Sequence, residues 1–336
     1  MTLRYKGKKI LIIGGTGTIG THLTNRLLQD EPEVIRIFSR DEHKQWEMQQ
    51  RLSGHRNLRF LIGDVRDADR VRRAMEDIDY VFHLAAMKHV PSCEYNPFEA
   101  VQTNVIGTQN VIQAAIAANV KKVLFTSTDK AISPTNTYGA TKLTAERLIS
   151  AAEFQKGPKK TIFSSVRFGN VMGSRGSVIP LFKKQILEER RVTVTDPDML
   201  RYMMTPSQAI ELILKANEMA EGGEVFVLKM PVIRLGDLVE VIIEEVKNKY
   251  CIQDSVQINE IGLRPGEKRY EELMTGDEYR LSIEYDDMYM LVPVFNKSSK
   301  SDSIINKKLS SIPTLNKQSA IAKESIKKWF EAENII

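Results

Sequence analysis

The sequence predicts an α/β protein with a doubly wound parallel sheet and a smaller C-terminal lobe. Short unbroken apolar runs alternate with longer segments of helical periodicity through the first half of the chain, which is typical of strands buried on both faces of a parallel sheet. A glycine-rich turn directly follows the first apolar run, as in nucleotide-binding βαβ units. The 336 residues, 42% hydrophobic and 27% charged, suffice for one large domain and a lobe.

The predicted strands are apolar runs of similar length that do not alternate with polar residues. The segments between them, such as Pro97–Ala118, have the length and periodicity of helices, so the chain repeats βα units. Ligands of such a sheet bind at the carboxyl ends of its strands. The six runs are Lys9–Ile13, Val34–Phe38, Leu58–Ile62, Tyr80–Leu84, Lys122–Thr126 and Ile162–Val166.

The pattern changes after Arg167, where loops become longer and richer in glycine, proline and charge. Helices are expected at Ser207–Met219 and Leu235–Lys249. Further on, Asn296–Lys308 is rich in Ser, Lys and Asn and predicts a mobile connection, followed by a terminal helix over Ala320–Ala332. We expect a nucleotide-binding domain over 1–168, to which later segments can return, a substrate-binding lobe mainly over 169–295, and a C-terminal extension over 296–336.

Composition excludes several classes of function. A net charge of +5 is too small to indicate nucleic-acid binding. Two cysteines cannot form a disulfide framework, so a cytoplasmic location is expected, and the five histidines lack metal-ligand spacing, so no metal is expected. The apolar run after the N-terminal cations is interrupted by Gly14 and Gly15, and no run reaches the roughly 18 residues of a membrane span.

The first predicted strand leads into a turn with glycines at 14, 17 and 20. Gly14 permits the tight turn, Gly17 lets the backbone approach a pyrophosphate, and Gly20 lets the next helix pack closely. The N-terminus of that helix then faces the phosphates. The turn predicts a Rossmann-like domain that binds a dinucleotide. Its other expected cofactor contacts are Thr16, Thr18 and Ile19.

The second strand ends in Ser39-Arg40-Asp41, without the carboxylate that usually binds the ribose of NAD directly at the strand end. A hydroxyl and a guanidinium suit a 2′-phosphate, which favours NADP, and Lys44 adds a cation nearby. The alternative is that Arg40 is a solvated loop charge and that Asp41 binds the ribose.

The ends of the third and fourth strands are expected to complete the cofactor site. Asp64, followed by Val65, is placed to accept a hydrogen bond from the adenine amino group, or else to cap the next helix. The small residues Ala85 and Ala86 let the backbone lie against the cofactor, with Lys88 as a further contact. His83 is expected to be a core histidine and not a catalyst.

Tyr138 and Lys142 form a Y-x-x-x-K pattern that places both side chains on one face of a helix. An ammonium beside a phenol lowers the pKa of the phenol and makes it a usable base for hydride transfer from an alcohol. The same spacing is common in surface helices, but its place just after the fifth strand favours catalysis. Both residues are also expected to contact the cofactor.

The fifth strand ends in Ser127-Thr128-Asp129-Lys130. Thr128 can hydrogen-bond a reacting hydroxyl. Asp129 and Lys130 supply an acid and a base, which a simple alcohol dehydrogenase does not need but an elimination does. Lys130 can act as a base only if its pKa is lowered, which the nearby positive Lys142 and nicotinamide ring favour. The alternative interpretation is a surface salt bridge between Asp129 and Lys130.

Together these residues resemble the extended short-chain dehydrogenase/reductase family and, more narrowly, the soluble UDP-N-acetylglucosamine 4,6-dehydratases of bacterial surface-sugar synthesis. The resemblance covers about residues 9–270 and includes Asp129-Lys130, where the similar dTDP-glucose dehydratases have Asp-Glu, and Tyr138, where many retaining, membrane-anchored relatives have Met. The matching stretches are 35–42, 85–91, 127–131, 138–142, 167–178 and 264–268.

The resemblance implies a C5-inverting dehydratase that uses NADP and acts as a homo-oligomer. Tyr138, tuned by Lys142, takes the C4 hydroxyl proton, Lys130 removes the C5 proton, and Asp129 assists loss of the C6 hydroxyl as water. By the same resemblance, the UDP-sugar contacts are Lys88, Asn170, Ser174, Arg175, Val178, Thr195, Arg201 and Glu267.

Two competing functions remain. A UDP-sugar 4-epimerase would use the glycine loop, Thr128, Tyr138 and Lys142 without needing Asp129 or Lys130. A non-catalytic NADP-binding sensor would typically lack the Tyr/Lys pair, which this chain retains.

Overall fold

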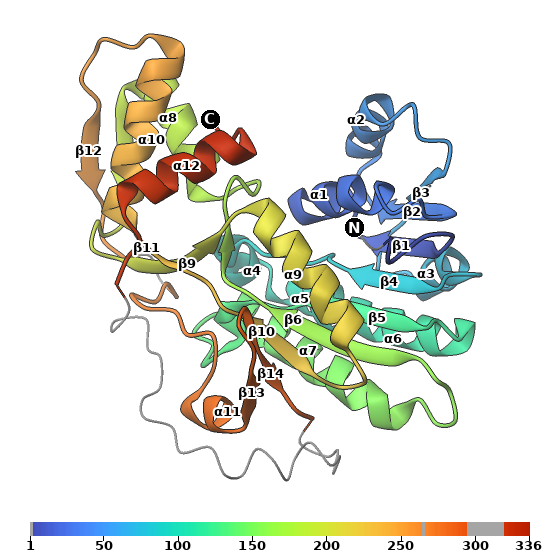
Figure 1. Cartoon of the computed structure of the whole chain (residues 1–336). Helices are drawn as coiled ribbons and strands as arrows, with labels where there is room; N and C mark the ends of the chain where they lie inside the picture. Colours follow the sequence, from blue (N-terminus) through green and yellow to red (C-terminus); the bar gives the residue numbers. More distant parts are fainter. Residues whose placement is uncertain (1–2, 264–265, 294–318) are drawn as a thin grey trace.

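The computed structural model describes residues 3–263, 266–293 and 319–336, and its centre is a nine-stranded sheet with helices on both faces (Figure 1). All six predicted runs are strands of this sheet, with ends that differ by at most one residue. They are β1 Lys9–Ile13, β2 Val34–Ser39, β3 Leu58–Ile62, β4 Tyr80–His83, β5 Lys122–Thr126 and β6 Ile162–Arg167.

The strand order is β13-β14-β10-β6-β5-β4-β1-β2-β3. Neighbours from β3 to β10 are parallel, whereas β14 and β13 are added antiparallel at one edge. The predicted doubly wound, mostly parallel α/β fold is therefore confirmed. The order reverses between β1 and β4, which is where such sheets bind ligands. Three strands after residue 168 return to this sheet: β10 Val225–Leu228, β13 Ser282–Glu284 and β14 Met288–Leu291.

Helices with apolar faces cover both sides of the sheet. On one side Leu23 and Leu27 of α1 and Ile210 of α9 belong to one buried cluster with the sheet residues Ile10 and Ile12. A second cluster joins α3, α6 and α7 to the other face. These helices are α1 Thr18–Leu28, α9 Pro206–Met219, α3 Ala68–Met75, α6 Gly107–Ala118 and α7 Thr137–Gln155; α2 Glu42–Arg51 contacts β2 and β3.

The segment expected as one helix over Pro97–Ala118 is divided. It contains α5 Pro97–Val101, a π-helical turn over Gln102–Ile106 and then α6. A π turn adds one residue to a helical turn without changing the apolar character of the run, so periodicity did not reveal it. The short helices before and after this region are α4 Val90–Tyr95 and the 3₁₀ turn Asp129–Ala131.

A smaller lobe stands over the carboxyl edge of the sheet, at the upper left of Figure 1. Its core contains Phe182, Ile186, Leu238 and Ile242, with Phe330 from the terminal helix. The expected helices near 207–219, 235–249 and 320–332 are present, and the Asn296–Lys308 prediction lies outside the described residues. The elements are α8 Val178–Glu189, α10 Leu235–Tyr250, α12 Lys323–Glu333, β7 Asn170–Val171, β8 Arg191–Val194, β9 Leu200–Met204, β11 Val232–Arg234 and β12 Gln257–Glu260.

A fully buried cation joins the catalytic helix to the C-terminal part of the sheet. Arg167 at the end of β6 pairs with Glu146 of α7 at 2.6 Å and with Glu278 of α11 Gly276–Arg280 at 2.9 Å. Since a buried charge is costly without partners, this network fixes α7 relative to the sheet. Among the described residues, none of the helices combines the length and apolarity needed to cross a membrane.

Candidate active site

A cavity at the carboxyl ends of β1, β2 and β4 contains the predicted cofactor residues, apart from Tyr138 and Lys142. The residues of the glycine turn form one wall of the cavity, and the residues that follow β2, β3 and β4 form the other walls. The predicted residues that line it are Gly14, Thr16, Gly17, Thr18, Ile19, Gly20, Ser39, Arg40, Lys44, Asp64, Val65, Ala85, Ala86 and Lys88.

The glycine turn has no room for a side chain at Gly14 or Gly20. Gly14 has φ +84°, and a Cβ there would lie 2.7 Å from the Ala85 nitrogen, whereas a Cβ at Gly20 would lie 2.5 Å from the Gly15 oxygen. Helix α1 begins at Thr18 without a side-chain cap, which leaves its first N–H groups available to an anion. A pyrophosphate therefore fits this turn.

Arg40 and Asp41, which follow β2, both line this cavity, but the Asp41 carboxylate is already engaged by Lys44. The Asp41 carboxylate caps α2 by accepting a hydrogen bond from the Lys44 backbone N–H at 3.0 Å. The same carboxylate forms an ion pair with the Lys44 side chain. Hydrogen bonds from Lys44 hold the pKa of Asp41 below its usual range. Arg40 stays 56% exposed and lies 3.6 Å from Asp64. Ser39 Oγ accepts a hydrogen bond from Gln45 at 3.0 Å.

Asp64 is not a helix cap, since the cap of α3 is Asp67, whose side chain accepts the Arg70 N–H. Burial favours protonation of Asp64, but hydrogen bonds from Arg66 and the charges of Arg66 and Arg40 hold its pKa below the ordinary value. A carboxylate acceptor therefore stands in the cofactor cavity. His83 is fully buried and bonded to Thr108 at 3.0 Å, and burial lowers its pKa to about 3, as suits a neutral core histidine.

Four predicted catalytic side chains meet beyond the end of β5. Thr128 Oγ1 donates to Asp129 Oδ1 at 2.9 Å and shares a hydrogen bond with Tyr138. Lys130 Nζ donates to the same Asp129 oxygen at 3.0 Å. Asp129 is fully buried, which excludes the surface salt bridge that the sequence left open. Its Oδ2 faces Gly169, where a Cβ would approach to 2.9 Å.

Lys142 interacts differently from the expectation. It is buried, donates to the Thr126 carbonyl at 2.5 Å and lies 3.9 Å above the Phe125 ring. Burial lowers its pKa to about 7, opposed by Glu146. The pKa of Tyr138 is raised by burial, while the Thr128 hydrogen bond and the Lys130 charge lower it. The expected lowering of the Tyr138 pKa is wrong for this structure.

The expectation of a lowered pKa for Lys130 is also wrong. Burial lowers it, but the charges of Asp129, Glu271 and Tyr138 outweigh burial, so the pKa lies above the ordinary lysine value. The expectation rested on the positive neighbours alone, whereas the Glu271 Oε1 lies 3.7 Å from Lys130 Nζ. Lys130 is thus an ammonium at neutral pH.

A second cavity opens between Lys130 and the small lobe, with apolar walls from α8, β9 and α10. Predicted substrate residues that line it are Lys88, Asn170, Val178, Thr195, Arg201 and Glu267. Lys88 lines both cavities, whereas Ser174 and Arg175 line the cofactor cavity instead. Arg175 donates from its backbone N–H to Thr18 at 3.1 Å and from its side chain to the Thr16 carbonyl. Arg201 lies 3.5 Å from Glu267.

Sequence analysis missed two residues. Asn104 in the π-helical turn bonds both the N–H and the carbonyl of Met87, and Thr141 of the catalytic helix, at 2.8–3.0 Å. An amide inside an apolar helical run was the available signal, because buried polar groups need partners. The other residue is Glu271, which no local motif singled out.

Comparison with known proteins agrees with this geometry. The family model described as polysaccharide biosynthesis protein matches residues 10–293. The X-ray structure of Pen from Bacillus thuringiensis has a TM-score of 0.92 and 54% identity, with 99% of each chain covered. An uncharacterized membrane protein of Methanocaldococcus jannaschii is 50% identical over 90% of both chains.

Two further relatives carry named activities. A UDP-N-acetylglucosamine 4,6-dehydratase (inverting) of Campylobacter jejuni is 42% identical over 90% of this chain and 88% of its own. A UDP-glucose 4-epimerase of Rickettsia typhi is 42% identical over 82% and 80%. The predicted family is confirmed: this chain belongs to the polysaccharide biosynthesis protein family.

Proposed function

We propose that the protein is an NADP-dependent UDP-N-acetylglucosamine 4,6-dehydratase. The observation that carries the proposal is the Asp129–Lys130 pair, at 3.0 Å, beside the Thr128–Tyr138 hydrogen bond. Lys130 also lines the cavity that adjoins the cofactor site at Lys88. An oxidation needs only the phenol, whereas an elimination also needs a base and an acid.

The proposed reaction divides the chemistry among these side chains. NADP, when bound, would accept a hydride from C4 and return it to C6. Tyr138 takes the C4 hydroxyl proton while Thr128 orients that hydroxyl. The C4 ketone acidifies the C5 proton, which Lys130 removes, and Asp129 assists departure of the C6 hydroxyl as water. Reprotonation at C5 completes the product without an external reductant.

The small lobe is proposed to hold the UDP part. Thr195 is buried, and Asn170 and Val178 line the same cavity, so they would contact the nucleotide sugar. Arg201 and Glu267 would interact with the diphosphate and the ribose hydroxyls, which requires their 3.5 Å ion pair to open or to share those contacts. Ser174 and Arg175 line the cofactor cavity and would lie between the two bound ligands.

NADP is preferred over NAD because Arg40 is exposed in the cofactor cavity while Asp41 is engaged with Lys44. Arg40→Ala is expected to weaken NADP binding about 10- to 100-fold, the value of a charged hydrogen bond, and to affect NAD little. Fluorescence titration with both reduced cofactors measures the effect. Arg66→Ala is the matched control, since Arg66 pairs with the same Asp64 at 2.8 Å but does not line the cavity. Equal losses for both cofactors would contradict the assignment.

Incubation with UDP-N-acetylglucosamine in deuterated water, followed by NMR, tests the function. We expect a 4-keto-6-deoxy sugar with deuterium at C5, because the C5 proton passes to an exchanging base. A C4 epimer without deuterium would show instead a 4-epimerase, the activity named for the Rickettsia relative. A protein that binds NADP without turnover would be a sensor.

A parallel incubation in ordinary water tests the configuration at C5. We propose inversion, which the name of the Campylobacter relative supports. The coupling constants of the C5 proton in a product made in ordinary water distinguish the two epimers. A product with unchanged C5 configuration would refute the proposed inversion but would still support the dehydratase assignment.

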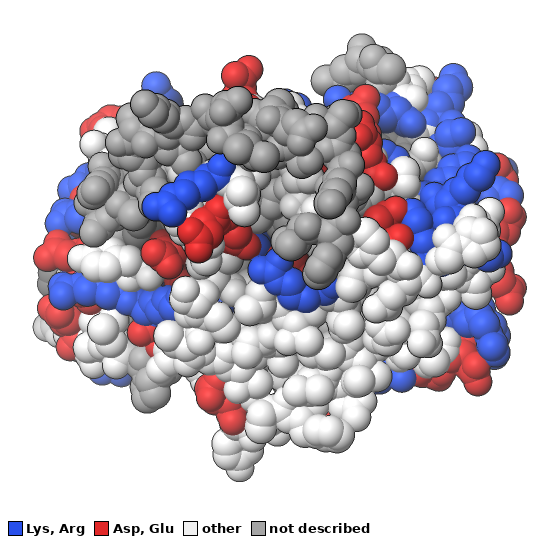
Figure 2. Space-filling view, turned by 90° about the horizontal axis from the view of Figure 1, so that it is seen from below, with Lys and Arg blue, Asp and Glu red and all other residues white. Residues whose placement is uncertain are grey.

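We further propose a cytoplasmic homo-oligomer. Tyr95, Phe98 and Ile106, on successive segments between α4 and α6, are 88%, 66% and 43% exposed. Figure 2 shows a broad area without Lys, Arg, Asp or Glu on the underside of the molecule. Exposed apolar surface of this kind marks protein–protein contacts. Light scattering should give a multiple of 38.2 kDa, and a monomer at micromolar concentration would refute the oligomer.

A further inference from the structure

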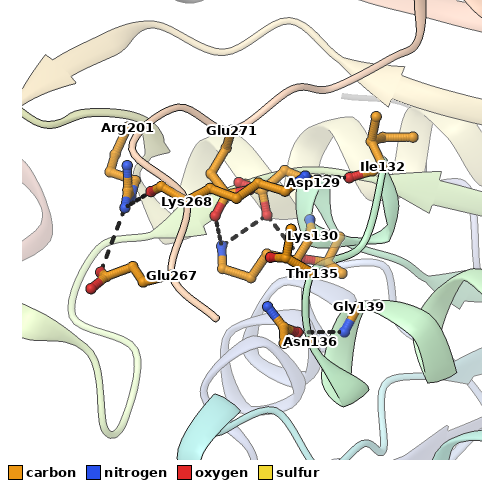
Figure 3. Close-up of polar contacts among 12 residues, drawn as sticks. Asp129, Lys130, Ile132, Thr135, Asn136, Gly139, Arg201, Glu267, Lys268 and Glu271 are labelled. Atoms are coloured by element: carbon orange, nitrogen blue, oxygen red, sulfur yellow. Dashed lines mark hydrogen bonds and ion pairs between the residues drawn. The ribbon is translucent and has the colours of Figure 1, made fainter. Parts of the chain in front are cut away.

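Glu271 is a buried carboxylate that the mechanism above does not use. It is 3% exposed, lines the substrate cavity, and lies 3.7 Å from Lys130 through Oε1. Its Oε2 and Asp129 Oδ2 are both buried, and neither has a hydrogen-bond partner within the described part of the chain. The Lys130 amine therefore lies between two carboxylates, each with one uncommitted oxygen (Figure 3).

Hydrogen bonds from two sides hold the segment that carries Glu271. On the α7 side, Thr135 and Asn136 donate to the Gly266 carbonyl at 3.0 and 3.1 Å, and Lys268 Nζ donates to the Ile132 carbonyl at 2.7 Å. These contacts join residues 266–268 to the loop that follows Lys130.

On the β9 side, Arg201 donates to the carbonyls of Lys268 and Arg269 at 2.8 and 3.0 Å. Figure 3 shows Lys268 between Arg201 and Ile132. A carboxylate held by such a frame has a fixed position, so its distance to the amine is a built feature of the site and not the chance approach of a surface side chain.

We propose that Glu271 is a positioning residue for the elimination step: with Asp129 it holds the Lys130 amine and governs when that amine can take the C5 proton. The inference rests on the proposed dehydratase function. An ammonium cannot accept a proton, and two adjacent carboxylates stabilise the ammonium. Neutralising one of them, by a proton on Glu271, makes Lys130 easier to deprotonate.

Charged groups of both signs surround this pair. Lys130 faces Asp129, Glu271 and Tyr138. Glu271 faces Lys130, Asp129, Arg201 and Lys268. Burial raises the pKa of Glu271 and Lys130 opposes this, but the net direction is upward, so Glu271 takes up a proton more readily than an ordinary glutamate. Lys88, His89 and Glu267 line the same cavity.

The test is the pH profile of C5 exchange in Glu271→Gln, measured with NADP-loaded full-length protein and UDP-N-acetylglucosamine in deuterated water. Glutamine keeps the shape and removes the charge. We expect the rise of C5 deuterium incorporation with pH to move to lower pH by roughly 1–3 units, the usual effect of one adjacent charge. Formation of reduced nicotinamide in a single turnover, which reports C4 oxidation, should keep its profile.

Glu272→Gln is the matched control, because Glu272 is the next residue, is exposed, and loses the same charge. Its profile should equal that of the wild type. Glu271→Asp retracts the carboxylate without removing it and should give a smaller shift of the same sign, which keeps the test valid should the glutamine variant not fold.

Rates that fall in parallel at every pH, with an unmoved profile, would overturn the role of Glu271 and leave the dehydratase assignment standing. Absence of C5 exchange in the wild type would overturn the dehydratase assignment, and this inference with it.

Discussion

Tyr138→Phe is expected to lower turnover by roughly 10²- to 10⁴-fold, the usual contribution of one general acid–base group. The substitution removes only the phenolic oxygen, which shares a hydrogen bond with Thr128. The ring still fills its place near the end of β5, so the fold should be kept. Because the proton acceptor is missing, bound substrate should form reduced nicotinamide more slowly by the same factor. Stopped-flow absorbance after mixing with UDP-N-acetylglucosamine measures this step directly.

Tyr95→Phe is the matched control, because it makes the same chemical change at a tyrosine that is 88% exposed. Its turnover should equal that of the wild type. The stability of Tyr138→Phe should change by about 1 kcal/mol, the net value of one hydrogen bond, as urea unfolding would show. A folded Tyr138→Phe protein with turnover near the wild type would remove Tyr138 from the mechanism.

The fold was predictable because its signals are local. The central parallel strands β1, β4, β5 and β6 are buried on both faces and read as apolar runs, and the glycine turn after β1 marks where the dinucleotide-binding unit begins. The π-helical turn at Gln102–Ile106 was not predictable, since one extra residue does not disturb a periodicity judged over several turns. It places Asn104 where it can bond Met87 and Thr141 together.

The proposed catalytic residues were predictable to the extent that they are close in the chain. Thr128, Lys130 and Tyr138 lie within 11 residues, so one strand end and one helix start suffice to place them together. Glu271 reaches Lys130 only because a distant segment is held against both α7 and β9. In the sequence it is one of two adjacent glutamates, and nothing local distinguishes the buried one from the exposed one.

The direction of the Lys130 pKa was predicted wrongly because the prediction rested on its positive neighbours, which lower a lysine pKa. In the structure the charge of Asp129, followed by that of Glu271, outweighs burial and holds this pKa above the ordinary lysine value. Lys130 therefore carries a proton before substrate binds. The loss of this proton must be coupled to substrate binding or to protonation of a neighbouring group.

Lys130→Met should separate the two halves of the reaction. Methionine keeps an unbranched stem of similar length and removes the amine, so C5 deprotonation is expected to slow by roughly 10²- to 10⁴-fold, while Tyr138 still takes the C4 proton. The variant should form reduced nicotinamide in a single turnover, release little 4-keto-6-deoxy product, and incorporate little deuterium at C5. Absorbance and NMR on the same samples measure these outcomes.

Removing the Lys130 amine leaves the Asp129 and Glu271 carboxylates together without a cation, and adjacent buried carboxylates repel. The double variant Lys130→Met/Glu271→Gln relieves this repulsion and should fold better while remaining equally unable to exchange C5. Lys121→Met is the surface control, since Lys121 also pairs with a carboxylate, Asp79 at 2.8 Å, but is 56% exposed. Normal dehydration by Lys130→Met would exclude Lys130 as the base. Loss of C4 oxidation together with elimination would instead show that Lys130 acts through the charge it places beside Tyr138.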